Sequence, residues 1–260
     1  MTLIAYLAFG LLIVSFIVAA VRLFLPVPAP LVPALTAFAS VLMLVQLIWR
    51  SATIGFVALV STYDGLVFFS LGVALLALAG EVSGWFKQRK ELMPAVLFTA
   101  VVISAVASSP LVSDAANPPM PALRSVWLVL HVALAFLGEA FFALAFVVSL
   151  AWFFTRDKAR KRDLDRLVYR SVAIGYPLFT AGAMIFGAIW AEQAWGRYWG
   201  WDPKEIWALI TWIAYSVYLH LHLRGARYRK AAHITNIAGF LLAMFTFLGV
   251  NYLFGGLHSY

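Results

Sequence analysis

Apolar residues run along the chain in long stretches that are separated by short polar or basic connections. A helix that crosses a bilayer takes about 20 apolar residues, so stretches of this length indicate transmembrane helices. Eight of them can be marked, at about residues 3–24, 31–49, 64–85, 92–111, 127–154, 171–190, 204–223 and 234–255. The pattern predicts an all-α polytopic membrane bundle of about eight transmembrane helices. We expect residues 1–260 to form a single integral membrane domain.

The composition excludes an ordinary soluble protein. Apolar residues make up 64% of the 260 positions and charged residues 12%, whereas about a quarter of the residues in soluble domains are charged. The short connections leave no room for a soluble catalytic domain. Cysteine is absent, which excludes disulfides, Cys-ligated clusters and Cys nucleophiles. Any redox chemistry must therefore come from a bound cofactor or a partner.

The basic residues are distributed unevenly between the two sides of the predicted membrane. Of the 19 Lys and Arg residues, 15 lie in the connections after the first, third, fifth and seventh stretches, and four lie in the others. Cytoplasmic connections carry the excess of basic residues, so the count predicts that both termini are non-cytoplasmic. It also accounts for most of the net charge of +8, so we expect no nucleic-acid partner. The basic run 156–170 is interpreted as a solvated cytoplasmic connection that contacts anionic lipid.

Tryptophan is concentrated in one predicted external connection. Six of the ten Trp residues fall within residues 190–212. An interfacial aromatic belt accounts equally well for the three at helix ends, Trp190, Trp207 and Trp212. Such a belt does not require the tighter aromatic group between them. That group consists of Trp195, Tyr198, Trp199 and Trp201.

The residues around this aromatic group favour a flat ligand. Two glycines within it allow close backbone turns. Asp202 and Pro203 are interpreted as the N-terminal cap and first turn of the next helix. Arg197 and Lys204 supply positive charge. Such a loop is suited to a large planar apolar ligand that bears carboxylates, with these two basic residues as partners of the carboxylates.

Two histidines are predicted at the same membrane face as the aromatic group. His131 lies at the outer end of the fifth stretch, and His258 lies just beyond the eighth. A histidine near a membrane interface is often a purely structural residue, but two that flank an aromatic loop favour metal ligation. Haem iron accepts axial imidazoles from its opposite faces, and the flat macrocycle needs apolar walls.

Two further histidines lie near the cytoplasmic end of the seventh stretch. His220 and His222 are two positions apart, about 200° around a helix, so at most one of them faces inward. His220 is predicted within the membrane, where ionisable residues are functional candidates. His222, and His233 beside the next basic connection, are interpreted as structural residues.

Three acidic residues lie in or near predicted spans. Glu139 lies in the middle of the fifth stretch, where a carboxyl group must be protonated, paired or directed into a polar cavity. Asp64 and Glu81 lie near the two ends of the third stretch and are interpreted as interfacial polar residues.

Residues 195–205 read WGRYWGWDPKE, which closely matches the tryptophan-rich WWD signature of haem-handling proteins of cytochrome c maturation. Within that superfamily, the chain resembles the CcsA family, also called ResC, of the system II pathway. The resemblance also rests on PALRSVWLVLHV at 121–132, YLH at 218–220 and GLHSY at 256–260. It extends from about Asp64 to the end of the chain.

The resemblance implies a protein that acts with a membrane partner, CcsB (ResB), as a cytochrome c synthase and is inactive without it. In this family haem b is the substrate, and it is held first within a bacterial or organellar inner membrane and then at the external face. There its vinyl groups form thioethers with a Cys-x-x-Cys-His apocytochrome c. The protein supplies positioning and no nucleophile of its own.

The resemblance also implies roles for individual residues. His131 and His258 match the external axial ligands of the haem iron, and His220 matches the ligand that this protein contributes within the membrane. Residues 190–205 match the external haem-binding loop. Its haem-holding residues are Trp195, Trp199, Trp201 and Asp202. The second ligand within the membrane comes from the CcsB portion in the family, so we expect the chain to need that partner.

Two other functions stay open on the sequence alone. A CcmC-like haem chaperone would load haem onto a carrier without forming thioethers, although eight stretches and the basic pattern favour the CcsA family. A small-solute transporter would need a line of polar residues or paired broken helices across the membrane. For that role the predicted spans offer Glu139, His220 and Pro177.

Overall fold

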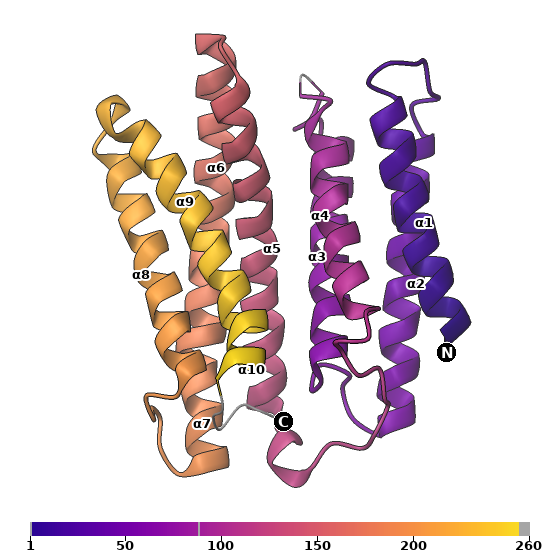
Figure 1. The fold of residues 1–260 in the computed structure, drawn as a ribbon, viewed down its shortest axis with the longest axis vertical. Coiled ribbons are helices and arrows are strands. Elements are labelled where there is room, and N and C mark those ends of the chain that lie inside the picture. Colours follow the sequence, from indigo (N-terminus) through magenta and orange to yellow (C-terminus); the bar gives the residue numbers. More distant parts are fainter. Residues whose placement is uncertain (1, 88, 255–260) are drawn as a thin grey trace. The chain divides into compact units, whose positions relative to one another are not determined.

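The computed structural model describes residues 2–87 and 89–254, and the regular secondary structure in these ranges is helical throughout. The chain divides into two compact units, Met1–Arg124 (unit 1) and Ser125–Tyr260 (unit 2). In each unit, successive long helices run in alternating directions (Figure 1). The expected all-α architecture is confirmed for the described residues.

Unit 1, over its described residues, is a ring of four long helices in which each helix packs against two others. They are α1 (Thr2–Val21), α2 (Leu31–Ile54), α3 (Thr62–Val82) and α4 (Leu92–Ala107), followed by the short 3₁₀ turn η1 (Pro121–Leu123). Small hydroxyl side chains join the helices across the apolar core. The hydroxyl oxygen of Ser15 lies 2.7 Å from that of Thr36, and the hydroxyl oxygen of Ser70 lies 2.8 Å from that of Ser104. Such bonds and close packing hold helices together where lipid removes the hydrophobic gain of association.

Unit 2 consists of four helical rods over its described residues, and these also form a ring. The first rod is α5 (Val126–Phe154). The second runs through α6 (Lys158–Phe179), the π-helical segment η2 (Thr180–Phe186) and α7 (Gly187–Trp195). The third is α8 (Pro203–Leu223). The fourth follows the turn η3 (Ala226–Tyr228) and runs through α9 (Arg229–Met244), the π-helical η4 (Phe245–Gly249) and α10 (Val250–Leu253).

Glycines let the first two rods of unit 2 approach closely. A Cβ atom at Gly138 would lie 2.7 Å from the backbone nitrogen of Phe179. A Cβ atom at Gly175 would lie 2.9 Å from the carbonyl oxygen of Gly138. A side chain at either position would push the rods apart, so this crossing depends on glycine. It brings the π-helical segment η2 against α5.

Seven helical segments of the described residues are long and apolar enough to cross a membrane. The eighth expected span, α4, is apolar but has only 16 residues, about 24 Å at 1.5 Å per residue, against a hydrocarbon core of about 30 Å. It ends at Ala107, earlier than the expected 111, where two serines and Pro110 follow. The chain is a multi-pass helical membrane protein with one short helix among the expected spans.

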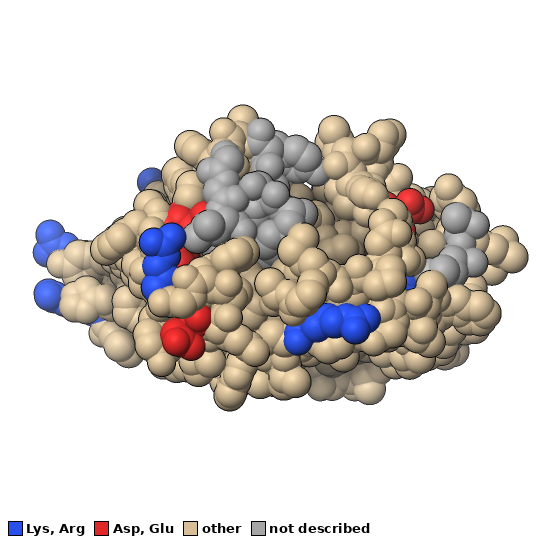
Figure 2. Space-filling model, turned by 90° about the horizontal axis from the view of Figure 1, so that it is seen from below, with Lys and Arg blue, Asp and Glu red and all other residues tan. Residues whose placement is uncertain are grey.

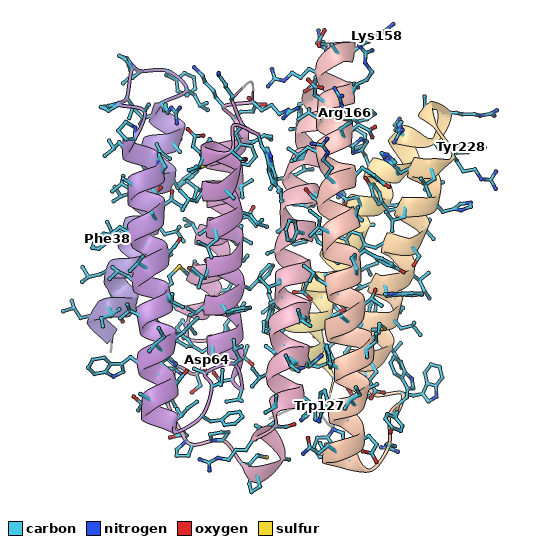
Figure 3. All side chains as sticks on the ribbon, turned by 180° about the vertical axis from the view of Figure 1, so that it is seen from behind. Phe38, Asp64, Trp127, Lys158, Arg166 and Tyr228 are labelled. Carbon is cyan, nitrogen blue, oxygen red and sulfur yellow. The ribbon has the colours of Figure 1, made fainter. Side chains whose placement is uncertain are left out.

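The second rod of unit 2 begins earlier than the sequence predicts. It starts at Lys158, whereas the predicted span starts at about 171. Leu164 and Leu167 are buried on one face of this extension, and basic side chains occupy the other. The basic run is therefore helical from Lys158 onward. The sequence pattern missed this start because a mean hydropathy averages over both faces of an amphipathic helix. Figure 3 shows Lys158 and Arg166 at this end of unit 2.

A buried ion pair joins α2 to α3 in unit 1. Arg50 donates from Nε to Asp64 at 2.5 Å, and the two side chains are 5% and 2% exposed. Ser61 also donates to Asp64 at 2.7 Å, and Arg50 donates to the carbonyl oxygen of Asp114 at 2.8 Å. Asp64 is thus a buried residue in the first turn of α3 that joins this helix to α2. The sequence pattern did not reveal its partner Arg50, which lies 14 residues earlier.

Candidate functional site

The aromatic group lies at the end of α7 and in the connection from α7 to α8, at one end of unit 2 (Figure 1). α7 ends at Trp195, and the capping residue Gly196 has a φ of 72°, a left-handed conformation that glycine favours. The backbone nitrogen of Gly196 donates to the carbonyl oxygen of Glu192 at 2.8 Å. The chain therefore turns sharply after Trp195, and residues 196–201 form a short loop.

A capping box fixes the far end of this loop. The Asp202 side chain accepts a hydrogen bond from the backbone nitrogen of Lys204 at 3.0 Å. Glu205 accepts from the backbone nitrogens of Gly200 at 2.8 Å and Asp202 at 3.1 Å, while Pro203 occupies the first helical position. The prediction of a cap and first turn at Asp202 and Pro203 is confirmed.

The loop presents two aromatic rings outward. Trp201 and Tyr198 are 68% and 63% exposed, whereas Trp190 on α7 is 1% exposed. Trp199 is half-buried and meets Trp201 edge to face, with ring centroids 5.8 Å apart. Trp195 meets Trp190 in the same way at 6.1 Å. The rings therefore lead from the interior of unit 2 to its surface, where an apolar ligand can contact them.

Trp201 is held in a backbone conformation that side chains disfavour. It is the one non-glycine residue with a positive φ, 57°, among the described residues. This left-handed conformation costs a bulky residue about 1–3 kcal/mol. The hydrogen bonds of Gly200 and Asp202 to Glu205 hold the backbone on both sides of it. Strain of this kind collects at functional sites.

Two basic residues accompany the rings. Arg197 is exposed and folds back over Gly200, where a Cβ atom would lie 2.9 Å from the arginine Nε. Lys204 lies half-buried in the first turn of α8. Figure 2 looks onto this end of unit 2, and most of the visible surface is neither basic nor acidic. The loop thus combines flat apolar rings with positive charge.

His131 lies beside Trp190, which in turn contacts Trp195 of the aromatic group. Its ring is nearly parallel to that of Trp190, at 3° and with centroids 6.3 Å apart. Its Nδ1 lies 2.9 Å from the carbonyl oxygen of Gly182. A proton on Nδ1 makes this a hydrogen bond and puts the lone pair on Nε2, the ring atom that can then ligate a metal. A backbone carbonyl therefore orients the imidazole and selects its tautomer.

The carbonyl acceptor belongs to the π-helical segment η2, which sequence reasoning missed. A Cβ atom at Gly182 would lie 2.3 Å from the backbone nitrogen of Ala135, and one at Gly187 would lie 3.0 Å from Nδ1 of His131. These glycines let η2 and α7 pass against the start of α5. Short π-helical segments in α-helices are frequent at functional sites. The sequence signal for this one is a pair of glycines downstream of Pro177.

The fourth rod reaches the same end of unit 2. Phe245 at the start of its π-helical segment packs edge to face on Trp207 near the start of α8, with ring centroids 4.5 Å apart. Figure 1 shows α10 near the α7 end of the unit. His258, the other expected external ligand, lies outside the described residues, which end at 254.

The two histidines of α8 lie near the opposite end of unit 2 and point in different directions. His222 is turned into the unit, with its side chain 11% exposed. His220 is exposed and accepts a hydrogen bond from Nε of Arg224 at 3.3 Å. His220 is 18 residues after Asp202, about 27 Å along the helix. The structure therefore brings His131 together with the aromatic loop and keeps His220 apart from both.

His222 belongs to a buried polar cluster that the sequence did not reveal. Asp165 on α6 lies 3.1 Å from Nη1 of Arg229 and 3.7 Å from Nδ1 of His222. Nε2 of His233 is 3.4 Å from the same carboxylate, without hydrogen-bond geometry. Tyr169 stacks on His222 with centroids 4.3 Å apart. These contacts join α6, α8 and α9 inside unit 2.

Glu139 is buried on α5, 6% exposed, and its Oε2 has no hydrogen-bond partner among the described residues. Nearby, Tyr215 stacks on Phe142 with ring centroids 3.5 Å apart, and its hydroxyl group likewise lacks a partner there. A buried carboxylate without a partner is costly. Glu139 therefore carries a proton or meets a polar group that is not among these residues.

Comparisons with known proteins agree on one family. The family model described as "Cytochrome C assembly protein" matches residues 59–258. "Cytochrome c biogenesis protein CcsA" of Chlamydomonas reinhardtii is 34% identical over 233 residues, which are 85% of this chain and 65% of that protein. The chain thus spans slightly less than two thirds of that relative. Proteins of the same name from Synechococcus sp. (strain RCC307) and Prochlorococcus marinus (strain MIT 9301) are 34% and 31% identical, and each match covers 87% of this chain and 83% of the relative. This chain belongs to the cytochrome c assembly protein family.

Proposed function

We propose that the chain is a haem-handling component of cytochrome c biogenesis. It holds haem b at the external membrane face while a Cys-x-x-Cys-His apocytochrome c receives the haem through thioether bonds, and it acts with a CcsB-type membrane partner. The observation that carries the proposal is the contact of His131 Nδ1 with the Gly182 carbonyl, beside the aromatic loop. Family membership and the CcsA relatives supply the class of process.

The environment of His131 supports its role as an axial ligand. Metal-ligating histidines commonly donate the second ring N–H to a backbone carbonyl or carboxylate, which fixes the ring and raises its basicity. Here Gly182 supplies the carbonyl and Trp190 supplies a parallel apolar wall. The opposite axial ligand in the proposal is His258. With both imidazoles on the iron, oxygen would have no coordination site, which would slow oxidation of the haem until the apocytochrome displaces one ligand.

The aromatic loop is the proposed platform for the porphyrin ring. Trp199 and Trp201 offer flat apolar surface for the ring. Arg197 and Lys204 flank these two tryptophans in the sequence and are the proposed partners of the haem propionates. Asp202 holds the platform through the cap of α8 and does not need to touch the haem. Its role in the proposal is therefore positioning.

The proposed orientation has both termini on the non-cytoplasmic side. The count of basic residues favours it. Arg50, one of the four basic residues counted against it, is 4% exposed inside α2 and paired with Asp64, so it does not belong to a connection. In this orientation residues 190–205 and His131 face outward from the cell or compartment. Apocytochrome c is then matured on the side where this loop lies.

The proposed inner site uses His220 and a ligand from the partner. His220 lies on the exposed face of α8, where a second membrane subunit can approach it. A histidine directed into unit 2, such as His222, would instead need its second ligand within the unit. The exposed position of His220 therefore favours a shared site over one that the chain completes alone.

In this mechanism the chain contributes positioning. His131 holds one face of the haem iron, the loop holds the ring edge, and Arg197 with Lys204 neutralises the propionates. The thiols of the apocytochrome add across the vinyl groups, and each thiol proton ends on the adjacent vinyl carbon. Bringing these groups to near-attack distance supplies the rate acceleration without a nucleophile from this chain.

Maturation in cells tests the proposal. The chain, a CcsB-type partner and an apocytochrome are expressed in cells that lack other cytochrome c assembly genes, and covalently bound haem is measured after denaturing electrophoresis. We expect holocytochrome only when both membrane proteins are present. Holocytochrome from the chain alone would remove the need for the partner. Bound haem with no thioether product under any pairing would overturn the proposal in favour of a CcmC-like chaperone.

A further inference from the structure

A polar cavity opens at one end of unit 1. It lies between the α1–α2 and α3–α4 connections, which occur at the same end of that unit (Figure 1). Its volume is about 590 Å³, within the range of ligand sites. Arg22, Lys87 and Lys90 line it together with Glu81 as the one acidic residue of the described lining. The lining thus carries a net charge of +2.

The cavity is held open by ordered contacts. Arg22 and Glu81 form an ion pair that joins the end of α1 to the end of α3. Phe86 is 1% exposed and its ring covers Gly80, where a Cβ atom would lie only 2.4 Å from that ring. The Phe86 backbone nitrogen also donates to the Gly80 carbonyl oxygen at 3.1 Å. The chain after α3 is therefore folded back, and Lys87 follows from a fixed turn.

The two lysines are available for a ligand. Both are exposed, and neither has an acidic partner among the described residues. Glu81, the acidic residue of the lining, is already paired with Arg22. An anion with several oxygen acceptors can therefore bind both ammonium groups without displacing an internal ion pair.

Exposed apolar side chains lie in the cavity lining or next to it in the sequence. Val82 lines the cavity and is 74% exposed. Phe24 and Leu25, which follow the lining residue Leu23, are 85% and 61% exposed, and Trp85, which precedes Phe86, is 37% exposed. A soluble anion does not need such a border. The combination of basic groups, an interfacial Trp and exposed apolar residues at the end of membrane-spanning helices is the environment of a lipid headgroup and its acyl chains.

We propose that this cavity binds the phosphate headgroup of an anionic phospholipid. Lys87 and Lys90 contact the phosphate oxygens, and the Arg22–Glu81 ion pair lies in the same lining. The acyl chains lie against the exposed apolar residues Phe24 and Val82. This site belongs to unit 1, whereas the residues proposed to handle haem belong to unit 2, and the proposal does not depend on that function.

Native mass spectrometry of the purified chain in detergent micelles tests the site. Phosphatidylglycerol and phosphatidylcholine with the same acyl chains are titrated separately. We expect preferential binding of phosphatidylglycerol and a loss of about thirty-fold in its affinity in the double variant Lys87→Gln, Lys90→Gln, since each basic side chain near a membrane surface contributes about five-fold in affinity. The matched control is Arg227→Gln, Lys230→Gln, an exposed basic pair in unit 2, which we expect to retain wild-type affinity.

Three results would overturn the proposal. The first is equal affinity for the two lipids. The second is an equal loss in the control variant, which would mean that binding follows overall charge and not this cavity. The third is glycerol 3-phosphate binding as tightly as phosphatidylglycerol, which would assign the cavity to a soluble phosphate compound. The readout is bound lipid, so none of these results bears on the haem proposal.

Discussion

At the residue scale, the candidate site depends on positions where a side chain would not fit. Gly182 allows η2 to lie against α5, because a Cβ atom there would be 2.3 Å from the Ala135 backbone nitrogen. The same close approach brings the Gly182 carbonyl within 2.9 Å of His131. One glycine therefore couples helix packing to the orientation of the proposed ligand.

Gly182→Ala should both destabilise the protein and disturb haem ligation. Overpacking of this kind costs about 1–3 kcal/mol, and the separation of η2 from α5 should remove the bond that orients His131. Gly10→Ala is the control, because its Cβ atom would meet nothing within 4 Å and Gly10 lies inside α1. Thermal unfolding in detergent and the spectrum of copurified haem provide the readouts. A Gly182→Ala protein that matches wild type in both would contradict the coupling.

Trp201 offers a test in which stability and function move in opposite directions. Trp201→Gly relieves the strain of the positive φ. We therefore expect an equal or higher unfolding temperature and a gain of up to about 1 kcal/mol in the free energy of unfolding. It also removes a ring of the proposed platform, so haem retention should fall several-fold. Trp49→Gly, at another exposed tryptophan in unit 1, should leave haem retention unchanged. Equal retention in all three proteins would remove Trp201 from the site.

At the element scale, the rotation of α8 decides which histidine faces outward. The contacts of His222 with Arg229 and Tyr169 hold one face of α8 against α6 and α9. His220, about 200° away around the helix, is left exposed. The buried cluster around Asp165 is therefore a positioning device for His220 in the proposed inner site.

Separate effects are expected from changing the two histidines. His220→Gly should leave thermal stability within about 0.5 kcal/mol, as is usual for exposed positions, but should lose haem from the complex with the partner, and added imidazole should restore it. His222→Gln should lower stability by about 1–3 kcal/mol, because it disrupts a buried polar network. Should imidazole rescue haem binding in His222→Gly and not in His220→Gly, the assignment of the two faces would be reversed.

The sequence predicted the positions of the helices better than it predicted which residues contact one another. Long apolar stretches, and the cap at Asp202 with Glu205 three residues later, are local patterns, so most spans and the start of α8 were predicted to within a few residues. The π-helical segments depend on how η2 packs on α5, and the pairs Arg50–Asp64 and Asp165–Arg229 join residues far apart in the chain. No local period encodes such contacts. The amphipathic start of α6 was missed because a mean hydropathy averages its buried leucines with the basic side chains on its other face.

At the whole-molecule scale, the central question is which membrane face carries the aromatic loop. The absence of cysteine in the chain makes single-cysteine labelling direct. Tyr198→Cys in the loop should react with a membrane-impermeant maleimide in intact cells, because this position is 63% exposed and is proposed to be external. Lys158→Cys, near the start of α6, should react only after the membrane is permeabilised. Labelling of the Lys158 variant alone in intact cells would reverse the proposed orientation.

The candidate site was predicted as a set of residues, and the structure supplies relations within that set. His131 and the aromatic group were expected at one face, and they lie together at one end of unit 2. The strain at Trp201 and the carbonyl that faces His131 come from backbone geometry, which composition and spacing do not express. The role of His258 stays a prediction, because it lies outside the described residues.

The most direct test of the central claim is the absorption spectrum of haem bound to the chain that has been purified with a CcsB-type partner. In His131→Gly we expect the external haem to become five-coordinate and oxidised and thioether formation to fail, while added imidazole restores six-coordinate iron. The control Gly10→Ala, in α1, should retain the wild-type haem spectrum. The same bis-imidazole spectrum and full maturation in His131→Gly would contradict the assignment of His131 as an axial ligand and, with it, the proposed external haem site.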